Sequence, residues 1–170
     1  MRTFFILSTI ALLLAISPAA PAKAKAKWYG PTFKLESLDG TKMTQTDVFV
    51  DGQLYLVDFW ASNCKPCNQL LPHIKDMVDE YGDRGFKVVI FSEDDAGSIS
   101  TAKTMLSGQD YPFTILFDLE GSVKTQMSIK AWPTTILLGP KGKELWRHFG
   151  YTSGNEDLIR EKIEANLPAK

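Results

Sequence analysis

The stretch that decides the fold is residues 60–67, which read Trp-Ala-Ser-Asn-Cys-Lys-Pro-Cys and carry the chain's only two cysteines. Residues at positions i and i+3 lie on one face of a helix, so Cys64 and Cys67 can close a disulfide if Cys64 stands at the helix start. Lys65 and Pro66 fit such a start, because the N–H that proline lacks would have no partner in a first turn anyway. The spacing therefore predicts a redox-active pair at the beginning of a helix.

Two other uses of the cysteine pair compete with redox chemistry. A structural disulfide gains from closing a long loop, and a ring of four residues stabilises a chain by only ~2 kcal/mol. A zinc site normally takes four ligands, and the two histidines, His73 and His148, are far from each other in the sequence. A Cys-x-x-Cys pair can bind Cu(I), however, so the motif alone leaves a soft-metal site open.

The beginning of the chain has the three parts of a secretory signal peptide, which we place at residues 1–24. A basic residue near the start is followed by an apolar stretch at 4–16 and then by small residues. Cleavage is expected within 22–26, and residues 25–29 are expected to be a flexible lead-in to one domain, 30–170. An uncleaved membrane anchor is the minority alternative, because the apolar stretch is shorter than the ~20 residues that span a bilayer.

Size and charge narrow the class of protein further. The chain has 170 residues and a formal net charge of −1. A balance this close to neutral gives no indication of nucleic acid binding. Without the leader, about 145 residues remain, which is enough to bury the core of one domain without disulfide staples.

The hydrophobic pattern around the cysteines predicts a strand-helix-strand unit. Residues 54–60 are nearly all apolar, as in a strand covered on both faces of a parallel sheet. Apolar residues then recur with helical periodicity as far as Tyr81, and Gly82 can end that helix. A second apolar strand at 86–91 can pair in parallel with the first only through this crossover.

The remainder of the chain predicts two hairpins, another strand and three further helices. The hairpins pair residues 32–35 with 41–43 and residues 134–138 with 144–149, each around a glycine-containing turn. The sum is an α/β sandwich whose sheet is partly antiparallel. The other strand is expected at 113–117, and the helices at 98–106, at 119–127 and at the end of the chain.

Three side chains are expected to carry the chemistry. Cys64 faces the positive end of the helix dipole beside Lys65, which favours its thiolate and makes it the attacking thiol. Cys67, one turn inside, would be less exposed and would resolve the mixed disulfide by attacking Cys64. Asp58 is a carboxylate in an otherwise apolar strand, so burial would raise its pKa and let it accept the proton of Cys67. A surface-facing position at the strand end is the alternative for Asp58.

Val-Asp-Phe-Trp-Ala at 57–61, followed by Cys-Lys-Pro-Cys at 64–67, resembles the active-site segment of the thioredoxin superfamily. The resemblance implies a thioredoxin fold, a three-layer α/β/α arrangement with a central mixed sheet, an N-terminal β-hairpin extension and a central helical insertion. The wider pattern is similar to the exported TlpA/ResA-type branch at four further places: Phe-Lys-Leu and Leu-Asp-Gly within 33–40, Pro72, Tyr-Pro-Phe at 111–113 and Pro-Thr-Thr at 133–135.

The resemblance also implies roles around the cysteines. Pro133, before the penultimate strand, is expected to be cis and to lie against the redox pair, and Trp132 to present its backbone and ring to a partner. A trans proline that opens a strand is the alternative. Trp60 is expected either to form a wall of the site or to lie in the core. The remaining supporting residues are expected to be Asn63, Lys65 and Pro66.

Two residues depart from the family pattern. Asn63 stands where such proteins usually have tryptophan, which replaces an apolar contact surface by hydrogen-bonding groups. Leu70 stands where ResA-like reductases have a glutamate, whereas Asp58 keeps the thioredoxin-like carboxylate. The first departure predicts an unusual partner preference, and the second argues against a dedicated role in reducing apocytochrome c.

The prediction is an exported, periplasmic thiol-disulfide oxidoreductase that acts as a reductant on cysteine-containing exported proteins and is re-reduced by a membrane electron-transfer partner. A disulfide oxidase or isomerase and a non-enzymatic copper-binding module are the alternatives. We expect a monomer with no metal and no cofactor besides the Cys64–Cys67 disulfide. Away from the cysteines, we expect a solvated loop at 93–95, Glu-Asp-Asp, and a surface or packing role for His73.

Overall fold

The computed structural model describes residues 27–167. The signal peptide expected at 1–24 lies outside the described residues. Two residues of the expected lead-in make defined contacts: the Trp28 ring centroid lies 5.1 Å from that of Phe49, and the Tyr29 N–H donates to the Lys141 carbonyl at 2.8 Å. No helix between residues 27 and 167 is both long enough and apolar enough to span a membrane.

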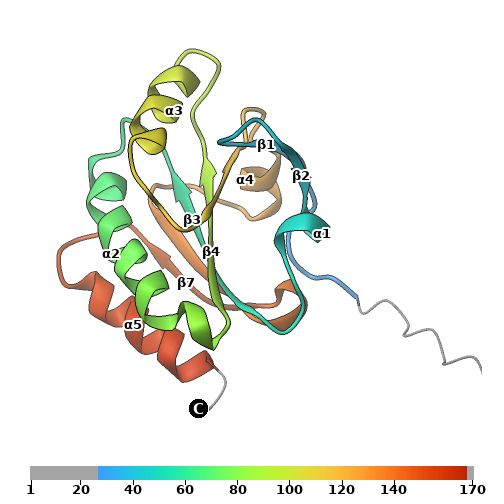
Figure 1. Ribbon diagram of the computed structural model, residues 1–170, viewed down its shortest axis with the longest axis vertical. Helices are drawn as coiled ribbons and strands as arrows, with labels where there is room; N and C mark the ends of the chain where they lie inside the picture. Colours follow the sequence, from blue (N-terminus) through green and yellow to red (C-terminus); the bar gives the residue numbers. More distant parts are fainter. Residues whose placement is uncertain (1–26, 168–170) are drawn as a thin grey trace, which may run out of the picture.

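A seven-stranded mixed sheet forms the centre of the molecule, in the order β2-β1-β5-β4-β3-β6-β7 (Figure 1). Strands β3, β4 and β5 run parallel, and every other neighbouring pair is antiparallel. Both predicted hairpins and the predicted parallel pair are therefore confirmed. The strands are β1 (Lys34–Ser37), β2 (Lys42–Thr44), β3 (Leu54–Trp60), β4 (Phe86–Ser92), β5 (Thr114–Phe117), β6 (Thr134–Leu138) and β7 (Glu144–Phe149).

Helices cover both faces of this sheet, which gives the expected α/β/α layers. Buried side chains of α2, α3 and α5 pack in one cluster on one face, and those of α1 and α4 pack in a second cluster on the other (Figure 1). Helix α3 lies between β4 and β5 in the chain, so it is the expected helical insertion. The helices are α1 (Gln45–Val48), α2 (Lys65–Tyr81), α3 (Ile99–Ser107), α4 (Ser122–Gln126) and α5 (Asn155–Asn166).

Helix α2 carries the cysteines and begins as the sequence predicts. Cys64 is the N-cap residue, and its sulfur accepts a hydrogen bond from the Cys67 N–H at 3.3 Å. Pro66 lies in the first turn, where its missing N–H leaves no carbonyl unpaired. Gly82 caps the other end, and its N–H donates to the Val78 carbonyl. The helix buries its apolar face against the sheet through Leu70, Leu71, Ile74 and Met77.

The register between β3 and β6 places the site residues. Alternate residues of a strand point to opposite faces. Leu56 and Trp60 belong to the cluster beneath α2, so Asp58, midway between them, faces α2 as well. Across the strand pair, Asp58 lies opposite Thr135. The same sheet face therefore carries the aspartate and the helix that bears the cysteines.

Candidate active site

Cys64 and Cys67 form a disulfide, as their spacing predicts. The Cα atoms are 5.3 Å apart, within the usual range for a bridge. Cys64 retains 9% of its surface and Cys67 none, which confirms the expected difference in exposure. Once the bridge is reduced, the helix dipole and the Cys67 N–H would both favour a thiolate at Cys64. The less buried cysteine is thus also the one whose thiolate the helix start favours.

Asp58 is fully buried in β3, so the surface-facing alternative is wrong. One carboxylate oxygen, Oδ1, accepts a hydrogen bond from the Thr135 hydroxyl at 2.7 Å. The other, Oδ2, is buried without a hydrogen-bond partner among the described residues. Burial raises the pKa of Asp58 to about 7, although the Thr135 hydrogen bond works in the opposite direction. A carboxylate with this pKa can both accept and release a proton at neutral pH.

Trp60 lies in the core and also braces the turn before Cys64. Its side chain has no exposed surface, and its indole Nε1–H donates to Asn68 Oδ1 at 2.9 Å. The Asn68 amide in turn donates to the Ser62 carbonyl at 3.2 Å. Asn68 therefore links the end of β3 to the turn that presents the first cysteine.

Asp94 holds the same turn from the neighbouring strand. Its carboxylate accepts hydrogen bonds from the Ser62 N–H at 3.0 Å, from the Ser62 hydroxyl at 2.5 Å and from the Ser92 hydroxyl at 2.9 Å. Only 4% of Asp94 is exposed. The prediction of a solvated loop is therefore wrong for Asp94, because protein groups take the place of water around its carboxylate. The prediction is confirmed for Asp95, which is exposed and accepts hydrogen bonds from backbone N–H groups near the start of α3.

The supporting residues predicted around the cysteines differ in exposure. Asn63 and Lys65 are exposed on either side of Cys64, whereas Pro66 is half-buried in the first turn of α2. Hydrogen-bonding and cationic groups therefore flank Cys64 in the chain. At position 63, where proteins with the resembling motif usually have tryptophan, the exposed side chain is an asparagine amide.

The peptide bond between Trp132 and Pro133 is cis, as the resemblance implies. Phe59 pairs with Thr134, so the register extended by one residue places Pro133 beside Trp60 at the same edge of the sheet. The Pro133 carbonyl accepts a hydrogen bond from the Gly150 N–H at 2.7 Å. Trp132 is 37% exposed, so it lies at the surface beside Pro133, and its binding of a partner stays a prediction.

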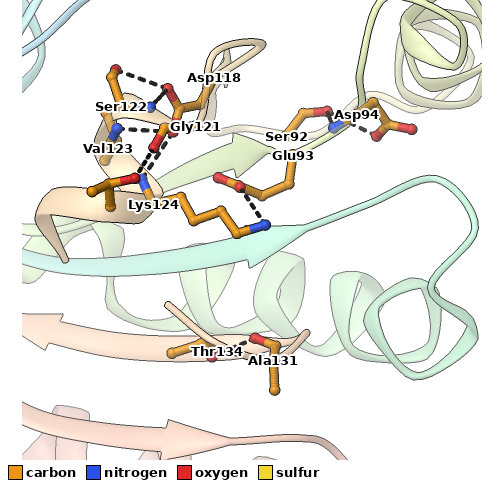
Figure 2. A network of polar contacts seen from close by, with 11 residues as sticks. Ser92, Glu93, Asp94, Asp118, Gly121, Ser122, Val123, Lys124, Ala131 and Thr134 are labelled. Carbon is orange, nitrogen blue, oxygen red and sulfur yellow. Dashed lines mark hydrogen bonds and ion pairs between the residues drawn. The ribbon is translucent and has the colours of Figure 1, made fainter. Parts of the chain in front are cut away.

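Glu93, next to Asp94 in the chain, is a further buried carboxylate, and sequence reasoning missed it. Its side chain is only 2% exposed, so the expected solvated loop is wrong here too. Burial, followed by the nearby charge of Asp118, raises the pKa of Glu93 to about 7, and Lys124 opposes the rise. Figure 2 shows the Lys124 side chain leaving α4 toward the Glu93 carboxylate. The available signal was a glutamate that directly follows the apolar strand β4.

Other polar groups are not arranged as a metal site. Within residues 27–167, no group of three or more His, Cys, Asp or Glu side chains could hold an ion. His73 lies on α2 with its ring 6.1 Å from that of Tyr151 and its Nε2 3.9 Å from Glu156 Oε1. It thus packs at the surface between α2 and the segment that leads into α5.

Residues 29–143 match the AhpC/TSA family. The chain belongs to this family. Thioredoxin-like protein YneN of Bacillus subtilis is 31% identical over 134 residues, which cover 79% of this chain and 76% of that protein. Thiol-disulfide oxidoreductase ResA of Halalkalibacterium halodurans is 25% identical over 145 residues, covering 85% and 79% of the two chains.

A solved structure with a related sequence has a similar fold. A Chlorobium tepidum protein, proposed to be a thiol:disulfide interchange protein DsbE, superimposes with a TM-score of 0.74 at 30% identity, covering 84% of this chain and 97% of that one. The expected thioredoxin-like fold and the expected enzyme class, thiol-disulfide oxidoreductase, are both confirmed.

Proposed function

We propose that this family member is an exported reductant that breaks disulfides in other exported proteins. One observation carries the proposal: an accessible sulfur, Cys64, is paired with a buried sulfur, Cys67, at the start of a helix that packs over the face bearing Asp58. Thiol-disulfide exchange needs an attacking thiolate, a resolving thiol and a proton acceptor, and these three residues supply them.

The first step uses the exposed sulfur. In the reduced enzyme, the Cys64 thiolate attacks one sulfur of the partner's disulfide. The partner's S–S bond breaks, its second sulfur leaves as a thiolate, and a mixed disulfide joins Cys64 to the partner. The exposed Asn63 and Lys65 flank this sulfur and would meet the partner first.

The second step uses the buried sulfur. Asp58 accepts the Cys67 proton, directly or through water, and the resulting thiolate attacks the Cys64 sulfur. The mixed disulfide breaks, and the partner leaves with both cysteines reduced once its thiolates have taken up protons. The two electrons have come from the Cys64–Cys67 pair, which is now a disulfide. A membrane electron-transfer partner would then return the pair to its dithiol form.

The identity of position 70 favours partners other than apocytochrome c. Leu70 is fully buried within the core cluster beneath α2. It offers no titratable group at the position where ResA-like reductases carry a glutamate, so Asp58 is left as the proton acceptor of the pair. We infer a broader set of cysteine-containing partners, and we propose the periplasm as its location because the sequence of residues 1–24 predicts a leader.

Mixed-disulfide trapping tests the function. Cys67→Ser, produced from the full-length gene in the native compartment, should accumulate partners on Cys64 that are released by dithiothreitol. Cys64→Ser is the matched control and should trap none. An absence of trapped proteins in Cys67→Ser would contradict a role on protein substrates.

The direction of transfer is tested separately. Equilibration of the purified protein with glutathione buffers measures the reduction potential of the pair. A reductant requires a potential well below that of the glutathione couple, and a strongly oxidising value would make the protein an oxidase. Sequencing the amino terminus of the secreted form tests export and locates the cleavage site.

A further inference from the structure

The indole of Trp132, next to the cis proline, carries a cation on its face. The Lys124 Nζ lies 4.6 Å from the ring centroid, within the ~6 Å range of a cation–π contact. The Trp132 side chain is 37% exposed, and the Lys124 side chain is also 37% exposed. The two side chains therefore form one surface feature, with the ammonium covering part of the ring.

The same ammonium forms an ion pair with a buried carboxylate. Lys124 Nζ lies 3.6 Å from Glu93 Oε2, whereas Glu93 Oε1 is buried and has no hydrogen-bond partner among the described residues. Glu93 is fixed in turn through its backbone, because its N–H donates to the Trp60 carbonyl at 2.8 Å. A line of contacts thus runs from the end of β3, through Glu93 and Lys124, to the exposed indole.

Two other carboxylates near this pair already have hydrogen-bond donors of their own. Asp118, which follows β5, is 2% exposed and accepts hydrogen bonds from the Ser122, Val123 and Lys124 N–H groups at the start of α4 (Figure 2). Asp94, next in the chain to Glu93, is engaged with Ser62 and Ser92. The Lys124 ammonium is therefore left to Glu93 and the indole.

We propose that Glu93 and Lys124 are positioning residues that hold the Trp132 indole in place for partner binding and take no part in the sulfur chemistry. The proposal rests on the proposed function, since it assumes that proteins dock beside Pro133. Glu93 anchors the ammonium, the ammonium restrains the ring, and the ring meets the partner. Loss of either charge frees the indole and weakens docking, while the rate of sulfur exchange within the complex stays the same.

The chain contains a matched control for this arrangement. Lys103 also lies between a carboxylate and a ring: its Nζ is 2.8 Å from Glu36 Oε1 and 5.2 Å from the Phe117 ring centroid. Its side chain is 37% exposed, like that of Lys124. Lys103→Met therefore removes an equivalent set of contacts away from Trp132.

The first measurement is acrylamide quenching of Trp132 in the full mature chain at pH 8.5, where Glu93 is ionised. The Trp132 signal is the difference between each variant and the same variant carrying Trp132→Phe, because the chain has four tryptophans. Lys124→Met and Glu93→Gln should raise the quenching constant about twofold, the scale of losing one part-exposed cation–π contact. Lys124→Arg should restore it, and Lys103→Met should leave it unchanged. An unchanged constant in Lys124→Met overturns the proposal.

The second measurement is the kinetics of insulin disulfide reduction. Lys124→Met should raise KM about two- to fivefold with kcat unchanged, again the size of one such contact. Two results overturn the role of Lys124 in partner binding: a fall in kcat at constant KM, or a higher quenching constant without a change in KM. If the wild-type protein reduces no insulin at all, the proposed function fails on that result alone, and the quenching data still decide whether Glu93 and Lys124 restrain the indole.

Discussion

Asp58 and Thr135 face each other across β3 and β6, and the threonine hydroxyl donates a 2.7 Å hydrogen bond to the buried carboxylate. The bond satisfies one oxygen of Asp58 and leaves Oδ2 without a hydrogen-bond partner within the described chain. Solvation of the charged form is therefore incomplete, which explains why its pKa lies at about 7 despite the hydrogen bond. Near pH 7 the buried Asp58 side chain can therefore hold or release a proton on the sheet face that α2 covers.

Replacing this carboxylate should stabilise the protein in alkaline solution. Asp58 has a usual pKa of 3.8 and a folded pKa of about 7, so stability falls as pH rises between these values and stays low above them. At pH 8, Asp58→Asn should raise the free energy of unfolding by at most about 4 kcal/mol, at about 1.4 kcal/mol per pH unit. Near pH 4 the two proteins should differ little. Urea unfolding at both pH values measures the effect, and an equal gain at the two would contradict it.

The same substitution should slow resolution of the mixed disulfide. Above pH 7 the Asp58 carboxylate accepts the Cys67 proton, so the wild-type rate should rise through pH 7. Asp58→Asn removes that acceptor and should lower the rate by about 100-fold, the lower end of general base catalysis. Stopped-flow kinetics of insulin reduction from pH 5 to 9 provide the profile, and an unaltered profile would exclude Asp58 as the base.

Thr135 should tune the pKa of Asp58. Thr135→Val removes the hydrogen bond that favours the ionised form, so the pKa of Asp58 should move further upward. The rise in the resolution rate should then occur at higher pH. Thr135→Ser keeps the hydroxyl and should restore the wild-type profile. A profile that moves to lower pH in Thr135→Val would show that the hydrogen bond stabilises the protonated form instead.

The hydrogen bonds of Asp94 should stabilise the turn before Cys64. Asp94→Ala leaves the Ser62 and Ser92 groups without their acceptor, which should lower the free energy of unfolding by about 3 kcal/mol. Asp95→Ala, at the exposed neighbour that accepts from the Gly97 and Ser98 N–H groups, should lower the free energy of unfolding much less, because water can replace its hydrogen bonds. Equal losses in the two variants would mean that burial of the Asp94 network adds nothing.

Lys65 should set part of the acidity of Cys64. Lys65 is exposed and directly follows Cys64, the residue that caps the positive end of α2. Lys65→Glu reverses its charge and should raise the pKa of the Cys64 thiol at low ionic strength, because a negative charge beside the sulfur disfavours the thiolate. Thiolate absorbance at 240 nm in the Cys67→Ser background measures the pKa, and Lys75→Glu, further along the same helix, should leave it unchanged.

Periodicity and turn chemistry were sufficient for most of the fold. Strands β3, β6 and β7 have the predicted bounds, because apolar runs there are delimited by glycines, proline and polar turns. The helix expected at 119–127 is shorter, and α4 begins only at Ser122, where the Asp118 carboxylate accepts its first N–H groups. Helix α1 was missed, since a single turn at Gln45–Val48 is too short to show periodicity.

The cysteine pair was predictable from its spacing and the cis Pro133 from the family resemblance, whereas the carboxylates were predictable only where a residue violated its local pattern. Asp58 interrupts an apolar strand, and that conflict already indicated burial and an altered pKa. Glu93 and Asp94 come after the apolar run of β4, at a place where polar residues are usual, so their burial depends on Lys124 and Ser62 from other parts of the chain. Such long-range pairings leave no periodicity in a single sequence.

Because Cys64 and Cys67 are unequally buried, an external thiolate can attack the disulfide at only one of its two sulfurs. An external thiolate can reach Cys64, with 9% of its surface open, whereas Cys67 has none. In the proposed function, attack on the oxidised protein therefore expels Cys67 as the leaving group, and in the reduced protein Cys67 is the sulfur that closes the ring. By microscopic reversibility, the order of bond making is the same whether electrons flow toward the partner or away from it.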